Sequence, residues 1–151
     1  MDVNDSVKRS DGGFVSLVTQ LSKLLHRRST EELLGMRLKA YMALGYIRDH
    51  PGTTQQELEN GLWMDANTVV LILNELEAAQ FSVRRRDPQD RRRHIVELTP
   101  AGRRALDRAD SARENLEDDL LAALSAEERK TLLKLVQRVL DAMVQPADIR
   151  A

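Results

Sequence analysis

The sequence of 151 residues predicts a mainly helical α+β protein with one β-hairpin, on three observations. Apolar residues repeat with helical spacing over most of the chain, separated by short polar or glycine-containing breaks. The spacing changes to that of strands only within residues 81–98. Between the two expected strands lies RRRDPQDRRRH, residues 84–94, which holds six arginines in a chain of net charge −1.

Two longer amphipathic helices are expected first. The apolar repeat that begins at Phe14 follows the i, i+3, i+4, i+7 rule and predicts a helix running to about Leu34. A second helix follows Gly35 and stops at HPG, residues 50–52. The buried side of this second helix is expected to carry Leu38, Tyr41, Met42, Leu44 and Ile47.

Two short helices come next. Thr54 and Glu57 form a capping box, in which each side chain bonds the backbone of the other residue, and this predicts a helix ending near Gly61. Asp65 is a suitable N-cap for the following helix. The inner face of that helix is expected to carry Val69, Ile72, Leu73 and Leu76. Two short helices joined by a tight connection are the pattern of a helix-turn-helix.

A β-hairpin is predicted around the turn DPQD, because proline fixes its backbone φ and aspartates cap turns with their side chains. The second strand is expected to carry His94, Val96 and Leu98 on one face, with Ile95 and Glu97 on the other.

Two helices are expected after the hairpin. Thr99 and Pro100 suit the N-cap and the first helical position of the next one. Ser125 and Glu128 form a second capping box that opens the final helix. The order of elements is therefore that of a winged helix-turn-helix with helices added at both ends.

Positive charge is concentrated in the hairpin. Residues 81–104 carry 8 basic and 3 acidic side chains, whereas acidic side chains outnumber basic ones before and after them. Several guanidinium groups cannot be buried together without partners, so the hairpin tip is expected to be exposed. One interpretation is a solvated turn in which Asp87 and Asp90 neutralise their neighbours.

The position of the hairpin favours nucleic-acid binding over that interpretation. A basic hairpin directly after a helix-turn-helix can follow the DNA backbone while the second helix enters the major groove. Arginine also suits the negative potential of a narrow minor groove. Asp90, two residues before Arg92, can hold that guanidinium in one rotamer and so lower the entropy lost on insertion.

The stretch LNELEAAQFSVRRRDPQDRRRHIVELTPAGR, residues 73–103, resembles the wing of MarR-type transcriptional regulators. The preceding TTQQELENGLWMDANTVVLILNELE resembles the helix-turn-helix of the same family. The resemblance implies a homodimer whose winged domains bind a pseudo-palindromic operator in double-stranded DNA, most simply as a ligand-responsive repressor. It implies dimerisation helices at residues 13–35 and 104–145, a DNA-binding domain at residues 36–103, and a flexible arm at residues 1–12.

The resemblance also assigns individual residues. Arg92, with Asp90, falls on the wing-tip pair and is the expected minor-groove residue. Asn67 and Thr68 fall at the start of the recognition helix. The residues expected to contact DNA are Thr54, Gln55, Asn67, Thr68, Val70, Leu71, Arg84, Arg86, Asp90, Arg91, Arg92 and Arg93.

Two departures from the family pattern bear on the mechanism. Gln80 stands where the family usually has a glycine after the recognition helix, so it must adopt a left-handed conformation or close the helix differently. Residues 65–80 contain no lysine or arginine. Base contacts would then come from Asn67, Thr68 and apolar side chains near thymine methyl groups. We therefore expect modest groove readout, an A·T-leaning site and a steep dependence on salt.

Other functions are less well supported. His26, His50 and His94 lack metal-ligand spacing, so no metal and no cofactor is expected. The resemblance implies a pocket for a small aromatic or anionic effector between the dimer helices and the DNA-binding lobe. The residues assigned to it are His26, Tyr41, Tyr46 and Trp63. Core packing is the default expectation for the three aromatic residues, and His26 is expected at an interface or at the rim of the pocket.

Two rival functions stay open at this point. A winged-helix module that binds an acidic protein partner is favoured by the missing cations on the recognition helix. An enzyme is disfavoured, because no catalytic triad, phosphate loop or dinucleotide turn is present. No apolar run reaches the roughly 20 residues of a membrane span and no signal peptide is evident, so a cytoplasmic protein without membrane contact is expected.

Overall fold

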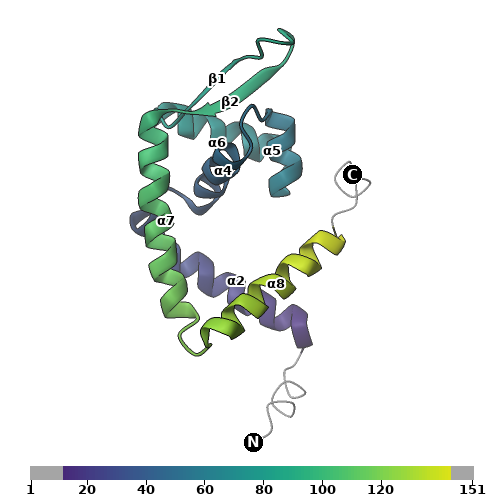
Figure 1. Cartoon of the computed structure of the whole chain (residues 1–151), viewed down its shortest axis with the longest axis vertical. Coiled ribbons are helices and arrows are strands. Elements are labelled where there is room, and N and C mark those ends of the chain that lie inside the picture. The colour runs from purple at the N-terminus through teal and green to yellow at the C-terminus, as the bar shows by residue number, and fades with distance from the viewer. Residues whose placement is uncertain (1–11, 144–151) are drawn as a thin grey trace, which may run out of the picture.

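The structure is a computed structural model that describes residues 12–143. The expected arm at residues 1–12 lies outside this range except for Gly12. In chain order the elements are α2 (Gly13–Arg28), α3 (Glu31–Leu34), α4 (Leu38–Asp49), α5 (Gln55–Leu62), α6 (Ala66–Ala78), β1 (Ser82–Arg86), β2 (His94–Leu98), α7 (Pro100–Leu120) and α8 (Ala126–Met143). This order confirms the predicted winged helix-turn-helix with flanking helices. In Figure 1, α7 runs from the hairpin at one end of the molecule to the turn before α8 at the other.

The first helix is shorter than predicted. It ends at Arg28, and the prediction that it runs to about Leu34 is wrong. The hydroxyl of Thr30 accepts a hydrogen bond from the Leu33 N–H at 3.2 Å and so caps the separate short helix α3. Hydroxyl side chains favour such caps over helix interiors, which explains the break.

The predicted starts of α5, α6 and α8 are confirmed by their caps. The Thr54 hydroxyl accepts from the Glu57 N–H at 3.2 Å, and the Asp65 carboxylate accepts from the Thr68 N–H at 2.7 Å. At α8 the capping box is reciprocal, because the Ser125 N–H also donates to the Glu128 carboxylate at 2.9 Å.

The core lies between α4, α6, β2 and the first half of α7. All four residues expected on the inner face of α6 are buried. On α4 the buried residues are Ala40, Ala43, Leu44 and Ile47. Met42 was expected among them but is 41% exposed, because helical spacing puts it opposite Ala40 and Ile47. Ala105, Leu106 and Ala109 anchor the start of α7 in the same core.

The strands β1 and β2 pair antiparallel and form the wing. Ile95 and Val96 point to opposite faces, yet both are buried. The chain before α5 covers the second face, since the Val96 N–H donates to the Thr53 carbonyl at 2.8 Å and Thr54 bridges to Ile95. A side chain on either face of β2 therefore contacts the protein interior.

Gln80 takes the left-handed conformation that its position demands, with φ 63°. The Phe81 N–H donates to the Leu76 carbonyl and the Gln80 N–H to the Glu77 carbonyl, both at 2.9 Å. This pair of bonds is the Schellman closure of a helix end. The helix end therefore has the same geometry that a glycine would give, and Gln80 adopts a left-handed backbone that is strained by its Cβ.

The helices α2 and α8 contain no buried residue in the described chain. Each nevertheless carries an apolar stripe. On α2 the exposed members include Phe14, Leu17, Val18, Leu21 and Leu24, and on α8 they include Leu135, Val136, Val139, Leu140 and Met143. Across residues 12–143, no helix is long and apolar enough to cross a membrane.

Candidate nucleic-acid interface

The wing tip is a turn built by two aspartates. The Asp87 carboxylate accepts from the Gln89 N–H at 2.9 Å, and the Asp87 N–H donates to the Arg93 carbonyl at 2.9 Å. Asp90 closes the other side, because its carbonyl accepts from the Arg93 N–H at 2.9 Å. These local bonds give the exposed tip a defined shape without any buried side chain.

Asp90 also holds Arg92, as the spacing of the two residues suggested. One carboxylate oxygen, Oδ1, accepts from the Arg92 backbone N–H at 3.1 Å and from Arg92 Nε at 3.4 Å. The Arg92 side chain is 93% exposed. Its remaining guanidinium donors, on Nη1 and Nη2, face solvent and can meet an anion outside the protein.

The other wing arginines are less available than the sequence suggested. Arg84 pairs with Glu77, Arg85 with Glu97 at 2.9 Å and Arg93 with Glu57 at 3.4 Å. Arg86 donates to the Arg91 carbonyl at 2.9 Å. The Arg91 side chain has no hydrogen bond or ion pair within residues 12–143. Among the six arginines, Arg91 and Arg92 therefore present the most accessible positive charge.

Arg84 joins the wing to the recognition helix α6. Its Nε donates to Glu77 Oε1 at 2.6 Å and its Nη2 to Glu77 Oε2 at 3.1 Å, a bidentate pair. The hydrogen bonds to Glu77 raise the pKa of Arg84. Arg84 is among the residues predicted to contact DNA, and the structure places its guanidinium against the flank of α6.

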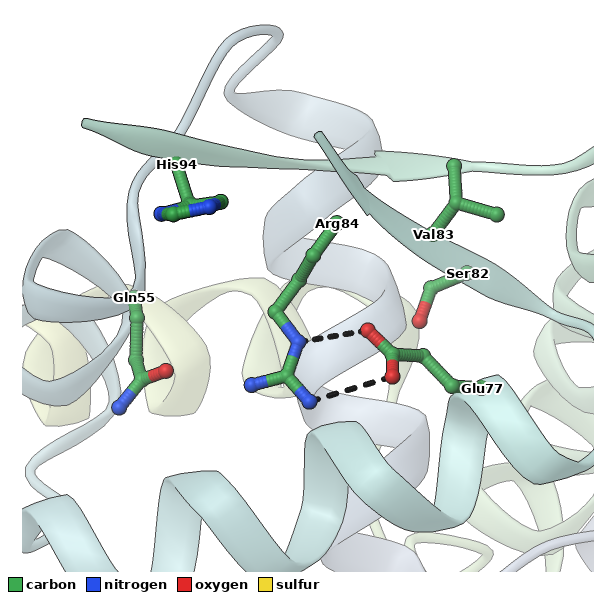
Figure 2. A pocket seen from close by; sticks show the side chains of 6 residues that line it. All are labelled: Gln55, Glu77, Ser82, Val83, Arg84 and His94. Carbon is green, nitrogen blue, oxygen red and sulfur yellow. Dashed lines mark hydrogen bonds and ion pairs between the residues drawn. The ribbon is translucent and has the colours of Figure 1, made fainter. Parts of the chain in front are cut away.

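A groove of about 630 Å³ lies beside this pair, between the wing and the start of α5. Figure 2 shows Arg84 reaching down from β1 to Glu77, with Gln55 and His94 on the other side of the groove. Ser82 is buried at its edge, and its hydroxyl has no hydrogen-bond partner within the described chain. Gln55 is thus the α5 residue that faces the space between helix and wing.

The outward face of α6 carries a stripe at positions i, i+4, i+7 and i+11. Its members Asn67, Leu71, Asn74 and Ala78 are all exposed. Thr68 and Val70, also expected to contact bases, are half-buried at its margins. Asn74 was not among the residues expected to contact DNA. Projecting the helix outward from its four buried residues would have found it.

Both acidic residues near the C-terminal end of α6 have basic partners. Glu77 pairs with Arg84, and Glu75 pairs with Arg37 at 2.8 Å on the opposite flank. Arg37 comes from the start of α4 and Arg84 from the wing. These two arginines compensate the negative charge of a recognition helix that has no cation of its own.

The expected effector residues divide into two groups. His26 and Trp63 line one pocket of about 320 Å³, together with Met42, Leu62 and Met64. Tyr46 stacks on His50 with ring centroids 3.9 Å apart and does not line this pocket. Trp63 is 55% exposed and has φ 55°, so an exposed aromatic side chain sits on a strained backbone at this pocket.

Tyr41 belongs to a polar network between α4 and α7. Its hydroxyl donates to Asp110 Oδ1 at 2.5 Å and accepts from Arg113 Nε at 2.8 Å. Arg48 donates to Asp110 Oδ2 at 2.6 Å. Burial and the bond to Asp110 raise the pKa of Tyr41. Burial opposes ionisation of Asp110, but the bonds from Tyr41 and Arg48 outweigh it and lower the pKa of this carboxyl.

No cluster of three or more histidine or acidic side chains suited to a metal occurs in residues 12–143. The three histidines remain apart, on α2, after α4 and on β2. The interface offers positive charge and hydrogen-bond donors for recognition.

A helix-turn-helix followed by an arginine-tipped hairpin defines a protein of the winged helix-turn-helix class. Residues 34–93 match the model of the MarR family. A protein of Thauera aromatica, named for transcriptional regulation of the hcr operon, is 36% identical over 99 residues. The match spans 66% of this chain and 60% of that protein, less than two thirds of the relative's length.

Solved structures agree with this family along most of the chain. The crystal structure of MarR has a TM-score of 0.79 at 28% identity, over 89% of this chain and 93% of that one. The transcriptional repressor CouR, bound to a 23-mer DNA duplex, has a TM-score of 0.77 at 25% identity, over 84% and 92% of the two chains. The chain is therefore similar to the MarR family in both sequence and fold.

Proposed function

We propose that this protein is a homodimeric transcriptional repressor that binds a pseudo-palindromic operator in double-stranded DNA and releases it when a small effector binds. The observation that carries the proposal is the wing tip, where Asp90 holds the exposed guanidinium of Arg92 beside a shaped turn. The likeness to a repressor bound to DNA supports the same function. The protein acts by binding, and it works in the cytoplasm, where it meets chromosomal DNA.

The wing supplies much of the affinity for DNA. Arg92 enters the minor groove, and Arg91 lies beside it with its charge unpaired in the described chain. The pairing of Arg84, Arg85 and Arg93 with carboxylates leaves these side chains to position the wing rather than to neutralise phosphates. A contact made largely by free guanidinium groups at a minor groove favours A·T-rich DNA and weakens as salt rises.

The helix α6 lies in the major groove and Thr54 and Gln55 approach the phosphates at the start of α5. Asn67 and Leu71 are exposed on the outward stripe of α6, where an amide can pair with adenine and an apolar side chain can meet a thymine methyl group. The pairing of Glu75 and Glu77 with arginines supports this placement, because unpaired carboxylates there would be repelled by the DNA backbone.

The dimer forms through residues 13–35 and 104–145. A helix with one apolar stripe and no covered residue is typical of an element that packs against a partner. The stripes of α2 and α8 are of this kind. Burying them between two copies sets the separation of the two recognition helices, and the half-sites then lie about one turn of DNA apart.

The effector binds between α2 and the winged body. The pocket of His26 and Trp63 supports this, since it joins an imidazole, an exposed indole and two methionines at the junction of α2, α4 and α5. Aromatic and methionine side chains suit a small aromatic ligand, and Lys39 at the same pocket suits an anionic group on it. A ligand that prefers one spacing of the winged bodies shifts the population away from the DNA-bound form.

Selection of genomic DNA fragments with the purified protein tests the proposal. We expect enrichment of one or a few pseudo-palindromic sequences, and release of the protein from them by some members of a library of small aromatic acids. A protein that enriches no fragment, yet captures an acidic protein, would instead be an interaction module.

A further inference from the structure

The outward stripe of α6 contains a second amide besides Asn67. Asn74 lies seven residues after Asn67, about two helical turns further along the same face, and it is also exposed. It differs from Asn67 in one respect, because its side chain is already engaged: Asn74 Oδ1 accepts a hydrogen bond from Arg84 Nη2 at 2.8 Å. The amide therefore has a partner inside the protein before any DNA arrives.

The chemistry of that partner fixes which end of the amide faces outward. A guanidinium has five donors and no acceptor, so only the oxygen of the Asn74 amide can face Arg84. The nitrogen Nδ2 must point away from it, and Nδ2 has no partner within residues 12–143. The orientation follows from hydrogen-bond chemistry alone, since the reverse orientation would set N–H groups against N–H groups.

Glu77 holds the guanidinium in turn. Two of its oxygens bind Nε and Nη2 of Arg84 at 2.6 Å and 3.1 Å, and Figure 2 shows the two planar groups side by side. Arg84 and Glu77 are each about one third exposed, at 30% and 32% of their side chains. A bidentate pair of this kind has one favourable geometry, so the guanidinium that orients Asn74 cannot rotate freely.

A free asparagine pairs with adenine by using both ends of its amide, accepting from N6 and donating to N7. At Asn74 the acceptor end is occupied and turned toward the wing, which leaves the donor end for the groove. The favourable base edges are then those rich in acceptors, namely O6 and N7 of guanine or O4 of thymine. The N4 donor of cytosine is the unfavourable one.

We propose that Asn74 determines specificity at one base pair of each half-site, and that Arg84 holds its amide so that it donates to the base. This inference rests on the proposed binding of DNA and adds to it a position and a chemical preference. Arg84 is a positioning residue here, and Glu77 positions Arg84.

The opposite flank of the same helix provides a matched control. Arg37 pairs with Glu75 there, with a nitrogen–oxygen distance of 2.8 Å. Arg37→Met and Arg84→Met each remove one cation and leave one carboxylate of α6 unpaired. Only Arg84→Met also frees the amide of Asn74.

The test is a selection of binding sites from a random duplex library, with base preferences measured as ratios within each variant. Asn74→Ala should lose about tenfold discrimination at one base pair per half-site. Asn74→Asp keeps the shape and the bond to Arg84 but has no donor, and it should shift that base toward cytosine. Arg84→Met should shift the same base toward adenine, whereas Arg37→Met should lower affinity without changing the preferred base.

The ratios separate specificity from overall affinity, so a weakened variant remains informative. The proposal is overturned if Asn74→Ala keeps every wild-type preference, or if Arg37→Met and Arg84→Met change the same base equally. A wild-type protein that enriches no sequence at all would contradict the proposed function itself, and this outcome is distinct from enrichment that does not depend on Asn74.

Discussion

The hydroxyl of Thr99 donates a hydrogen bond to the backbone carbonyl of Gln80 at 2.6 Å and also accepts one from the Gly102 N–H at 2.9 Å. One side chain thus joins the end of the recognition helix to the beginning of α7. Gln80 is left-handed, with φ 63°, at the place where this connection is made. The bond helps to hold a conformation that a side chain with a Cβ disfavours.

Gln80→Gly should therefore stabilise the protein. Removing the Cβ relieves about 1 kcal/mol of strain, partly offset by the greater freedom of glycine when unfolded. We expect a rise of roughly 2 °C in Tm and no loss of DNA affinity, measured by thermal unfolding and by anisotropy. Gln56→Gly is the control, because Gln56 lies exposed in the first turn of α5 and its replacement should lower Tm.

Arg92→Ala should weaken DNA binding strongly while leaving the fold intact, since the side chain is 93% exposed and, among residues 12–143, bonds only Asp90. Because each copy of the dimer loses this arginine, the affinity for DNA should fall about 100-fold and the salt slope should decrease by about 2. Fluorescence anisotropy at several salt concentrations measures both. Arg85→Ala, which removes a cation already paired with Glu97, should have a much smaller effect. Equal losses for the two variants would refute the assignment of Arg92 to the minor groove.

Leu21→Glu should dissociate the dimer, because it places a charge in the middle of the apolar stripe of α2. Two copies of the leucine, each worth about 2 kcal/mol when buried, are lost from one interface. Sedimentation velocity at micromolar concentration should show a monomer with unchanged helical content. Val15→Glu is the matched control, since Val15 is 75% exposed and lies off the stripe. A dimer that persists in Leu21→Glu would argue against α2 as part of the interface.

Tyr41→Phe should lower the free energy of unfolding by about 1–2 kcal/mol, because Asp110 and Arg113 each lose a hydrogen bond. The effect depends on pH in a defined direction. The folded pKa of Asp110 is lowered, so its contribution is present above the usual carboxyl pKa and is lost as pH falls through the lowered value. The folded pKa of Tyr41 is raised, so its contribution is present at neutral pH and is lost only as pH rises through that raised value.

Urea unfolding at a series of pH values below 7 tests this. The difference between wild type and Tyr41→Phe should shrink as the pH falls through the lowered pKa of Asp110 and its carboxylate becomes protonated. Tyr46→Phe is the control, because the Tyr46 hydroxyl has no hydrogen bond in the described part of the chain. A difference between wild type and Tyr41→Phe that stays constant across this range would show that the Asp110 carboxylate does not contribute through Tyr41.

The sequence predicted the fold well where local chemistry decides it. The capping residues Thr54, Asp65, Thr99 and Ser125 each act within three residues of themselves, so their pattern could be recognised without a structure. The break at Thr30 was missed because the apolar repeat continues past it. Periodicity alone does not show that a hydroxyl at this position will cap a new helix instead of continuing the old one. The burial of Ile95 depends on Thr53 and Thr54, which lie 42 and 41 residues earlier, and strand alternation carries no such information.

The site was harder to predict because its charges are paired across the fold. The sequence predicted that positive charge is concentrated in the wing. The structure pairs part of that charge, since Arg84 is bound to Glu77 while Arg91 and Arg92 stay accessible. That pairing brings together residues from two different elements, and no spacing rule in the sequence indicates it. The effector residues were equally hard to predict. His26 and Trp63 line one pocket, whereas Tyr41 bonds Asp110 and Tyr46 stacks on His50.

The carboxylates of α6 are neutralised by arginines from other elements, so the charge of the DNA-binding surface depends on how α4 and the wing pack against this helix. Glu77 is neutralised only while β1 holds Arg84 beside it, and Glu75 only while α4 holds Arg37. If the wing came loose, the recognition helix would turn a carboxylate toward the duplex and repel it. We therefore expect a chain whose wing has not folded against α6 to bind DNA more weakly, because its recognition helix then carries uncompensated negative charge.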